Sequence, residues 1–145
     1  MLSIMRFLLI ILLTAIPIIG QAGQYRISGS VLVKKAGILY VYLVDKEQFS
    51  IPFTGIKDLR ITLEESQEQE VPFSFSGIPE GQYGIRVFVD TNGNGKLDRG
   101  FSGPSEPWGM SWKGEPKKGI PRFRDIAFYV DRDIQNILID TRSHK

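Results

Sequence analysis

Apolar residues recur at every second position in several short stretches, and this period is the feature that most constrains the fold. The clearest stretch has Tyr83, Ile85, Val87 and Val89 at its apolar positions. Because alternate side chains of an extended strand lie on one face, such a stretch is typical of a half-buried β-strand. No stretch keeps the 3.6-residue period of an amphipathic helix. The alternation therefore predicts an all-β protein.

Seven stretches carry a strand pattern. They are residues 25–34, 38–44, 59–63, 71–75, 83–89, 126–130 and 137–139. Residues 38–44 are almost continuously apolar, which fits a central strand, and Pro72 favours an edge position because proline has no N–H to donate. Short strands with turns between them predict an antiparallel β-sandwich of about seven strands, as in immunoglobulin domains. A small closed barrel is the alternative.

The N-terminal 22 residues have the layout of a secretory signal peptide. Arg6 precedes an apolar run over residues 7–19, and Gly20 and Ala22 are the small residues before the expected cleavage point. An uncleaved membrane anchor is the alternative, but about 13 apolar residues are fewer than the roughly 20 that span a bilayer. We therefore expect an exported protein, periplasmic or secreted, with residues 23–145 as a single domain and no membrane contact after cleavage.

Composition narrows the classes of function. The chain has no cysteine, which excludes disulfides, thiolate zinc sites and a cysteine nucleophile. Its one histidine, His144, lies at the C-terminal end, where it is poorly placed for a serine–histidine triad. A net charge of +2 does not favour nucleic acid as a partner. The sequence favours a non-catalytic protein, although a carboxylate pair of the glycosidase kind stays open.

A long segment, residues 90–119, interrupts the strand pattern. It contains seven glycines and three prolines, so we expect an irregular loop. Long loops in compact domains are often functional. We therefore expect the functional site in this loop.

The beginning of this loop resembles a calcium-binding pattern. Asp90, Asn92, Asn94 and Asp98 stand at positions 1, 3, 5 and 9, Gly95 stands at position 6, and the carbonyl group of Lys96 occupies position 7. Alternate residues of a curled loop point inward, and calcium binds six to eight oxygen atoms in a flexible shell. These residues are the predicted metal ligands.

The pattern is incomplete, so an alternative stays open. Position 12 is Phe101 instead of a bidentate glutamate, and no helices flank the loop, which excludes an EF-hand. A further carboxylate from Glu106 or Asp125 is the expected completion, with a dissociation constant of roughly 10⁻⁴–10⁻³ M. The alternative is an ordinary turn without an ion, because Asn-Gly dipeptides are common in hairpins and Asp90 can cap a turn.

Two tryptophans follow in the same loop. Trp108 and Trp112 lie in a segment rich in glycine and proline. Indole rings in such a loop can stack on sugars, which makes a glycan-binding surface one interpretation. The other is that both rings cover the open end of the sandwich core. The partner of this loop, extracellular or periplasmic, stays unidentified.

Residues 75–128 carry four short motifs in a fixed order. They are G-x-Y-x-I-x-V-F-x-D at 81–90, N-G-N-G-K-L-D at 92–98, G-P-x-E-x-W-G-M-S at 103–111 and P-x-F-x-D at 121–125. In these motifs the stretch resembles the domain of unknown function 2141 family of exported bacterial proteins. Trp108 stands where the family often has tyrosine. The resemblance implies an exported β-sandwich of the immunoglobulin/prealbumin-like kind. It implies no activity.

Overall fold

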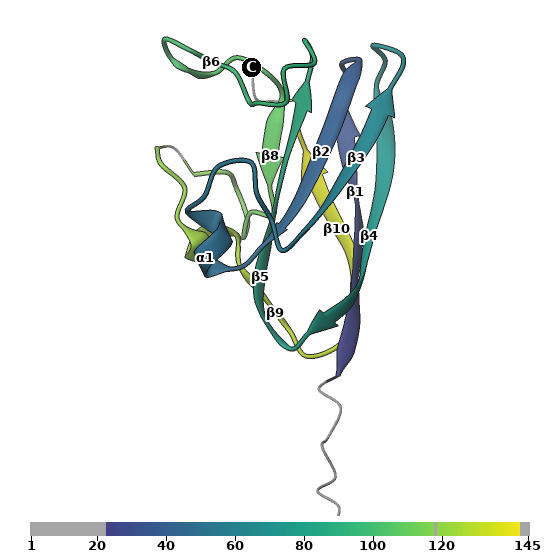
Figure 1. Cartoon of the computed structure of the whole chain (residues 1–145), viewed down its shortest axis with the longest axis vertical. Coiled ribbons are helices and arrows are strands. Elements are labelled where there is room, and N and C mark those ends of the chain that lie inside the picture. The colour runs from purple at the N-terminus through teal and green to yellow at the C-terminus, as the bar shows by residue number, and fades with distance from the viewer. Residues whose placement is uncertain (1–22, 118, 143–145) are drawn as a thin grey trace, which may run out of the picture.

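A computed structural model describes residues 23–117 and 119–142, and these residues are mostly β-strand, as predicted. The proposed signal peptide, residues 1–22, lies outside the described residues. No helix among the described residues is long and apolar enough to cross a membrane. The strands form two main sheets that lie on either side of a common core (Figure 1).

The first sheet has three strands in the order β10-β1-β4. They are β1 (Gln24–Val33), β4 (Gln69–Pro79) and β10 (Ile134–Asp140). The edge position of β4 agrees with the expectation from Pro72. β1 is antiparallel to β4 but parallel to β10, with a register shift between Ile27 and Gly29. The prediction of a purely antiparallel sandwich is therefore wrong for this pair, because strand direction depends on the connections between distant segments and not on local alternation.

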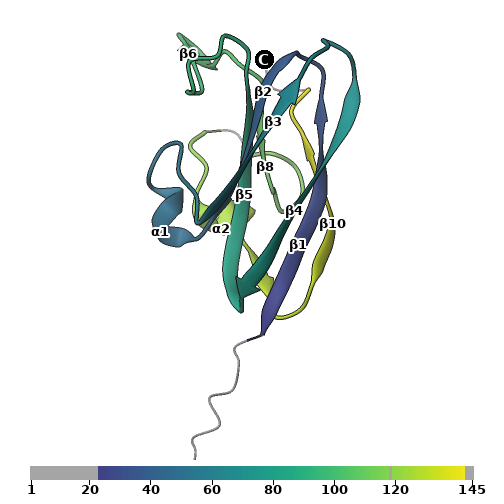
Figure 2. The same cartoon turned by 45° about the vertical axis from the view of Figure 1, so that its right-hand side comes forward.

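The second sheet has the order β3-β2-β5-β8, and β9 also pairs with β5. Its strands are β2 (Gly37–Val44), β3 (Lys57–Leu63), β5 (Gly81–Asp90), β8 (Trp108–Met110) and β9 (Phe128–Val130). All of its pairs are antiparallel. Figure 2 shows this sheet as a layer separate from the first, so the described strands do not close into a barrel.

The inner core lies between the two sheets and is formed by the apolar phase of each strand. Leu39, Leu43, Ile85 and Val89 are fully buried there, and they belong to the central strands β2 and β5. From the first sheet, β1, β4 and β10 contribute Ile27, Val31, Phe73, Ile78 and Ile139 to the same cluster. The two-residue alternation therefore places the apolar side chains of both sheets in one core.

Residues 90–119 are more regular than the sequence predicted. They contain β8 and a small two-stranded sheet, β6 (Arg99–Gly100) with β7 (Gly103–Pro104). Two short helices were also missed: α1 (Lys46–Phe49) and α2 (Phe123–Ile126). Because α2 occupies the start of the predicted strand 126–130, β9 begins only at Phe128. These elements are short, and β8 and β9 form by pairing with β5 rather than by a local pattern.

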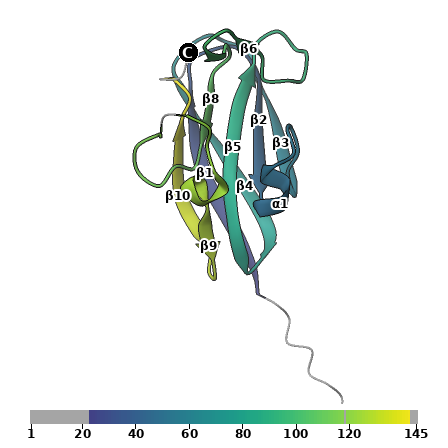
Figure 3. The ribbon, with the colours of Figure 1, turned by 90° about the vertical axis from the view of Figure 1, so that its left-hand side faces the viewer.

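The outer face of the second sheet, which points away from the first sheet, is covered by short helices and loop segments. Figure 3 looks onto this face, with α1 in front of β2 and β3 and α2 against β5. Tyr40, Tyr42 and Phe88 stack with one another there, with ring centroids 4.9 to 6.3 Å apart. We call this set of side chains the outer cluster; it also includes Val44, Ile126, Phe49, Leu97, Trp108, Met110, Trp112 and Phe123.

Candidate functional site

Asp90 organises the loop that follows β5. Its side chain is buried, and its Oδ1 accepts backbone N–H groups from Gly93 at 2.7 Å and Asn94 at 3.2 Å. Oδ2 accepts the N–H of Gly95 at 2.7 Å. Gly93 and Gly95 have φ values of 76° and 75°, a conformation that glycine adopts without steric cost. One carboxylate and two glycines thus curl the chain, as the spacing of these residues predicted.

Three of the other predicted ligands, Asn92, Asn94 and Asp98, meet one another. Asn92 donates its amide N–H to Asp98 Oδ2 at 2.5 Å, and Asn94 donates to both carboxylate oxygens of Asp98 at 2.9 and 3.0 Å. The amide oxygens of Asn92 and Asn94 accept the backbone N–H groups of Asn94 and Lys96. The side chains of Asn92, Asn94 and Asp98 therefore converge at one place above the curled backbone.

Glu106 holds the two ends of this loop. Its side chain is buried, and Oε1 accepts both the N–H and the hydroxyl of Thr91 at 2.7 and 2.9 Å. Oε2 accepts the N–H of Asp98 at 3.0 Å. The structure thus brings Glu106 to the predicted site, where its carboxylate bonds the N–H groups that begin and end the loop.

Asp125, the other carboxylate considered for the ion, lies elsewhere. It belongs to α2, and Ile126 beside it packs where a side chain at Gly84 would be. Gly84 is six residues before Asp90 on β5, or about 20 Å along the strand. Lys117 bonds Asp125 at 2.6 Å and the N–H of Arg122 bonds it at 3.0 Å. These two hydrogen bonds lower the pKa of Asp125 from its usual 3.8 to about 2.

The loop offers few negative charges to a cation. Among the described residues, no group of three or more His, Cys, Asp or Glu side chains is placed to hold a metal ion. The oxygens near Asp98 are those of one carboxylate and two amides, and each amide has turned an N–H toward Asp98. A rotation of either amide by half a turn would replace that N–H by oxygen, and calcium accepts such neutral oxygens. Such a rotation would also break the bonds that the amide oxygens of Asn92 and Asn94 accept from the backbone N–H groups of Asn94 and Lys96.

The tryptophan rings pack on the outer cluster rather than at the end of the inner core. Trp108 lies in β8 opposite Phe88 of β5, and its ring meets Trp112 edge-on with centroids 6.3 Å apart. Both side chains are half-buried. The indole N–H of Trp112 is buried without a hydrogen-bond partner among the described residues. The edge-on arrangement differs from a flat two-ring platform for sugars.

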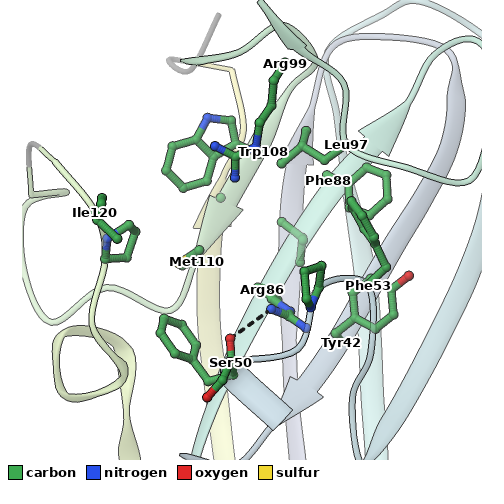
Figure 4. A pocket seen from close by; sticks show the side chains of 15 residues that line it. Tyr42, Ser50, Phe53, Arg86, Phe88, Leu97, Arg99, Trp108, Met110 and Ile120 are labelled. Carbon is green, nitrogen blue, oxygen red and sulfur yellow. Dashed lines mark hydrogen bonds between the residues drawn. The ribbon is translucent and has the colours of Figure 1, made fainter. Parts of the chain in front are cut away.

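A pocket of about 280 Å³ opens beside Trp108 on the outer face (Figure 4). Its walls come from segments far apart in the sequence: β5, β8, the chain after α1, the 97–99 segment and residues 120–121. No motif in the sequence predicted this pocket. A signal was present, because apolar Tyr42 and Phe88 occupy the strand phase that points away from the inner core, which indicates that this face is covered.

Arg86 lies in the pocket wall and fastens the chain after α1 to the sheet. Its guanidinium donates to the carbonyl oxygens of Ile51 at 2.5 Å, Thr54 at 2.6 Å and Phe49 at 3.3 Å. It also lies over the ring of Tyr42, 5.7 Å from the centroid. Burial lowers the pKa of the Arg86 guanidinium below its ordinary value, and its Nε is buried without a partner among the described residues.

The comparisons with known proteins identify the family of the chain. A family model described as an uncharacterized protein conserved in bacteria (DUF2141) matches residues 30–137, from within β1 to within β10. Neither the comparison with curated proteins nor that with solved structures gave a match. Because the family model covers most of the chain, the protein belongs to the DUF2141 family of uncharacterized bacterial proteins, as the resemblance of its motifs predicted.

Proposed function

We propose that this protein is an exported, non-catalytic β-sandwich module of the immunoglobulin/prealbumin-like kind. Its 90–98 loop binds one calcium ion in a structural role. The ordered loop then holds the Trp108 and Trp112 surface in place for an extracellular or periplasmic partner. The layout of residues 1–22 supports export.

The observation that carries the calcium proposal is the convergence of Asn92, Asn94 and Asp98. Three side chains rich in oxygen meet above a backbone that Asp90 has already curled. A loop folded before the ion arrives loses little conformational entropy on binding, which favours affinity. Calcium would neutralise the Asp98 carboxylate after the two amides turn their oxygens inward.

The same loop couples the ion to the tryptophan surface. Glu106 bonds the N–H of Asp98, and it is only two residues from Trp108 in the chain. The backbone also connects these segments, because the N–H of Ser105 bonds the carbonyl of Asp98 at 2.8 Å. A bound ion would therefore steady the segment that leads into β8.

An ion-free structural module is the second candidate. It is favoured by the fact that Asp90, Asp98 and Glu106 already accept N–H donors at both of their oxygens. The same bonds support a non-catalytic role, because a carboxylate whose oxygens already accept hydrogen bonds from backbone and amide N–H groups is a weak general base.

Thermal unfolding in chelator and in calcium separates the two candidates. With a dissociation constant of roughly 10⁻⁴–10⁻³ M, about 10 mM calcium stabilises the fold by about 1–3 kcal/mol, or several degrees in melting temperature. Asp98→Asn should abolish this shift, whereas Asp131→Asn, on an exposed residue outside the loop, should keep it. A melting temperature that calcium leaves unchanged in the native protein would exclude the ion and leave the structural module.

A further inference from the structure

The geometry points to the pocket beside Trp108 as a binding site for a small molecule that has a planar apolar body and one carboxylate group. This inference deepens the proposed function by naming the ligand class of the Trp108 surface, and it rests on that part of the proposal. It does not require calcium.

The walls of the pocket suit a planar apolar body. Phe49, Phe53, Phe88, Trp108 and Met110 line it, together with Ile120 and Leu97. Aromatic rings prefer stacked or edge-on contacts with one another, so this lining favours an aromatic group over a flexible chain. The volume, about 280 Å³, lies just below the usual range for small-molecule sites, so the body is one of single-ring size.

The charge of the pocket specifies an anion. Among the described residues that line it, the only charged side chains are Arg86 and Arg99, and there is no acidic one. Figure 4 shows Arg99 entering from the end where Trp108 lies and Arg86 from the end near Ser50. Among the residues that the structure describes, the partners of the Arg86 guanidinium are neutral carbonyl oxygens and the Tyr42 ring. Two positive charges in an apolar wall attract one negative group.

Arg99 is the residue that we assign to the carboxylate. It is exposed and can reorient, whereas Arg86 is held by four carbonyl groups. A guanidinium forms two parallel hydrogen bonds with a carboxylate, a geometry that a neutral amide does not reproduce. The ring of the ligand would then lie between Trp108 and Phe53. The positive charge of Arg86 would lie at the end of the pocket near Ser50.

Three probes of matched shape test the assignment: 3-phenylpropionate, 3-phenylpropionamide and 3-phenylpropylamine. Binding is followed by tryptophan fluorescence and calorimetry on the native protein in chelator. We expect the carboxylate to bind about tenfold more tightly than the amide and the amine to bind most weakly. Arg99→Gln should lower the affinity for the carboxylate to that for the amide, and Arg132→Gln, on an exposed arginine outside the lining, should leave it unchanged.

Several results would overturn the inference. Equal affinity for carboxylate and amide removes the role of charge, and an unchanged affinity in the Arg99→Gln variant removes the role of that residue. No response to any probe, or a response to N-acetylglucosamine alone, removes the ligand class. Because these titrations are made in chelator, their failure is independent of the calcium result. Tight binding of 3-phenylpropionate combined with an absent calcium shift would leave this inference standing and reject the ion.

Discussion

The two faces of the β3-β2-β5-β8 sheet differ in how they are covered. The inner face meets a second sheet, and Leu39, Leu43, Ile85 and Val89 are fully buried there. The outer face is covered by short helices and loop segments, and it contains an arginine, stacked tyrosines and a pocket. A continuous apolar interface gives stability, whereas a cover assembled from separate segments leaves space and charge for binding. We therefore expect stability to depend on the inner face and ligand binding on the outer one.

The largest expected effect on stability comes from replacing one leucine on each face by alanine. Leu39 is fully buried in the inner core, and Leu39→Ala should lower the free energy of unfolding by about 2–5 kcal/mol, because it removes apolar contact and leaves a cavity. Leu97 is half-buried in the outer cluster, so Leu97→Ala should cost clearly less. Urea unfolding measures both variants. Equal losses would mean that the two faces contribute alike.

Arg86→Ala tests the fastening of the outer cover. The substitution removes the hydrogen bonds to the carbonyl groups of Phe49, Ile51 and Thr54. Hydrogen bonds from charged groups contribute about 1.5–3 kcal/mol, so we expect a loss in that range. Residues 46–54 should also become more sensitive to limited proteolysis. Unchanged cleavage of this segment would show that the sheet holds it without Arg86.

Asp90→Asn tests the loop itself, without any ion present. An amide keeps one oxygen but replaces the other by an N–H₂ group that faces the N–H of Gly95. We expect a loss of about 1 kcal/mol or somewhat more in chelator, measured by urea unfolding. Asp131→Asn, on an exposed carboxylate, should change stability by less than about 0.5 kcal/mol. If Asp90→Asn lowered the free energy of unfolding no more than the control variant, the loop would form its curl without the Asp90 carboxylate.

The smallest expected effect is a pH dependence from α2, part of the outer cover. The pKa of Asp125 is about 2 in the folded protein against 3.8 ordinarily. A lowered pKa favours folding above the ordinary value, so this contribution is present near neutral pH and is lost as the pH falls from about 4 toward 2. Unfolding of the native protein and of Asp125→Asn across this range should show a difference that shrinks with acid. A constant difference would contradict the assignment.

The inner face was predictable from the sequence and the outer face largely was not. Residues 83–89 alternate so regularly that the strand and its buried side chains followed from periodicity alone. The Asp90 loop was also predictable, because turns require particular residues at fixed spacing. The pocket was not, since Phe53, Leu97 and Trp108 meet only after folding. The parallel direction of β10 and the presence of the helix α2 could not be predicted for the same reason.

The parallel pairing of β1 with β10 has a consequence for the order of assembly. The strand β1 lies between β4 and β10. One of its two edges therefore pairs with residues more than 100 positions later in the chain; Ile27, for example, pairs with Ile134. Contacts of such sequence separation slow folding. A nascent polypeptide that ends before residue 134 therefore exposes one unpaired edge of its earliest strand, and the completion of synthesis is what closes that edge.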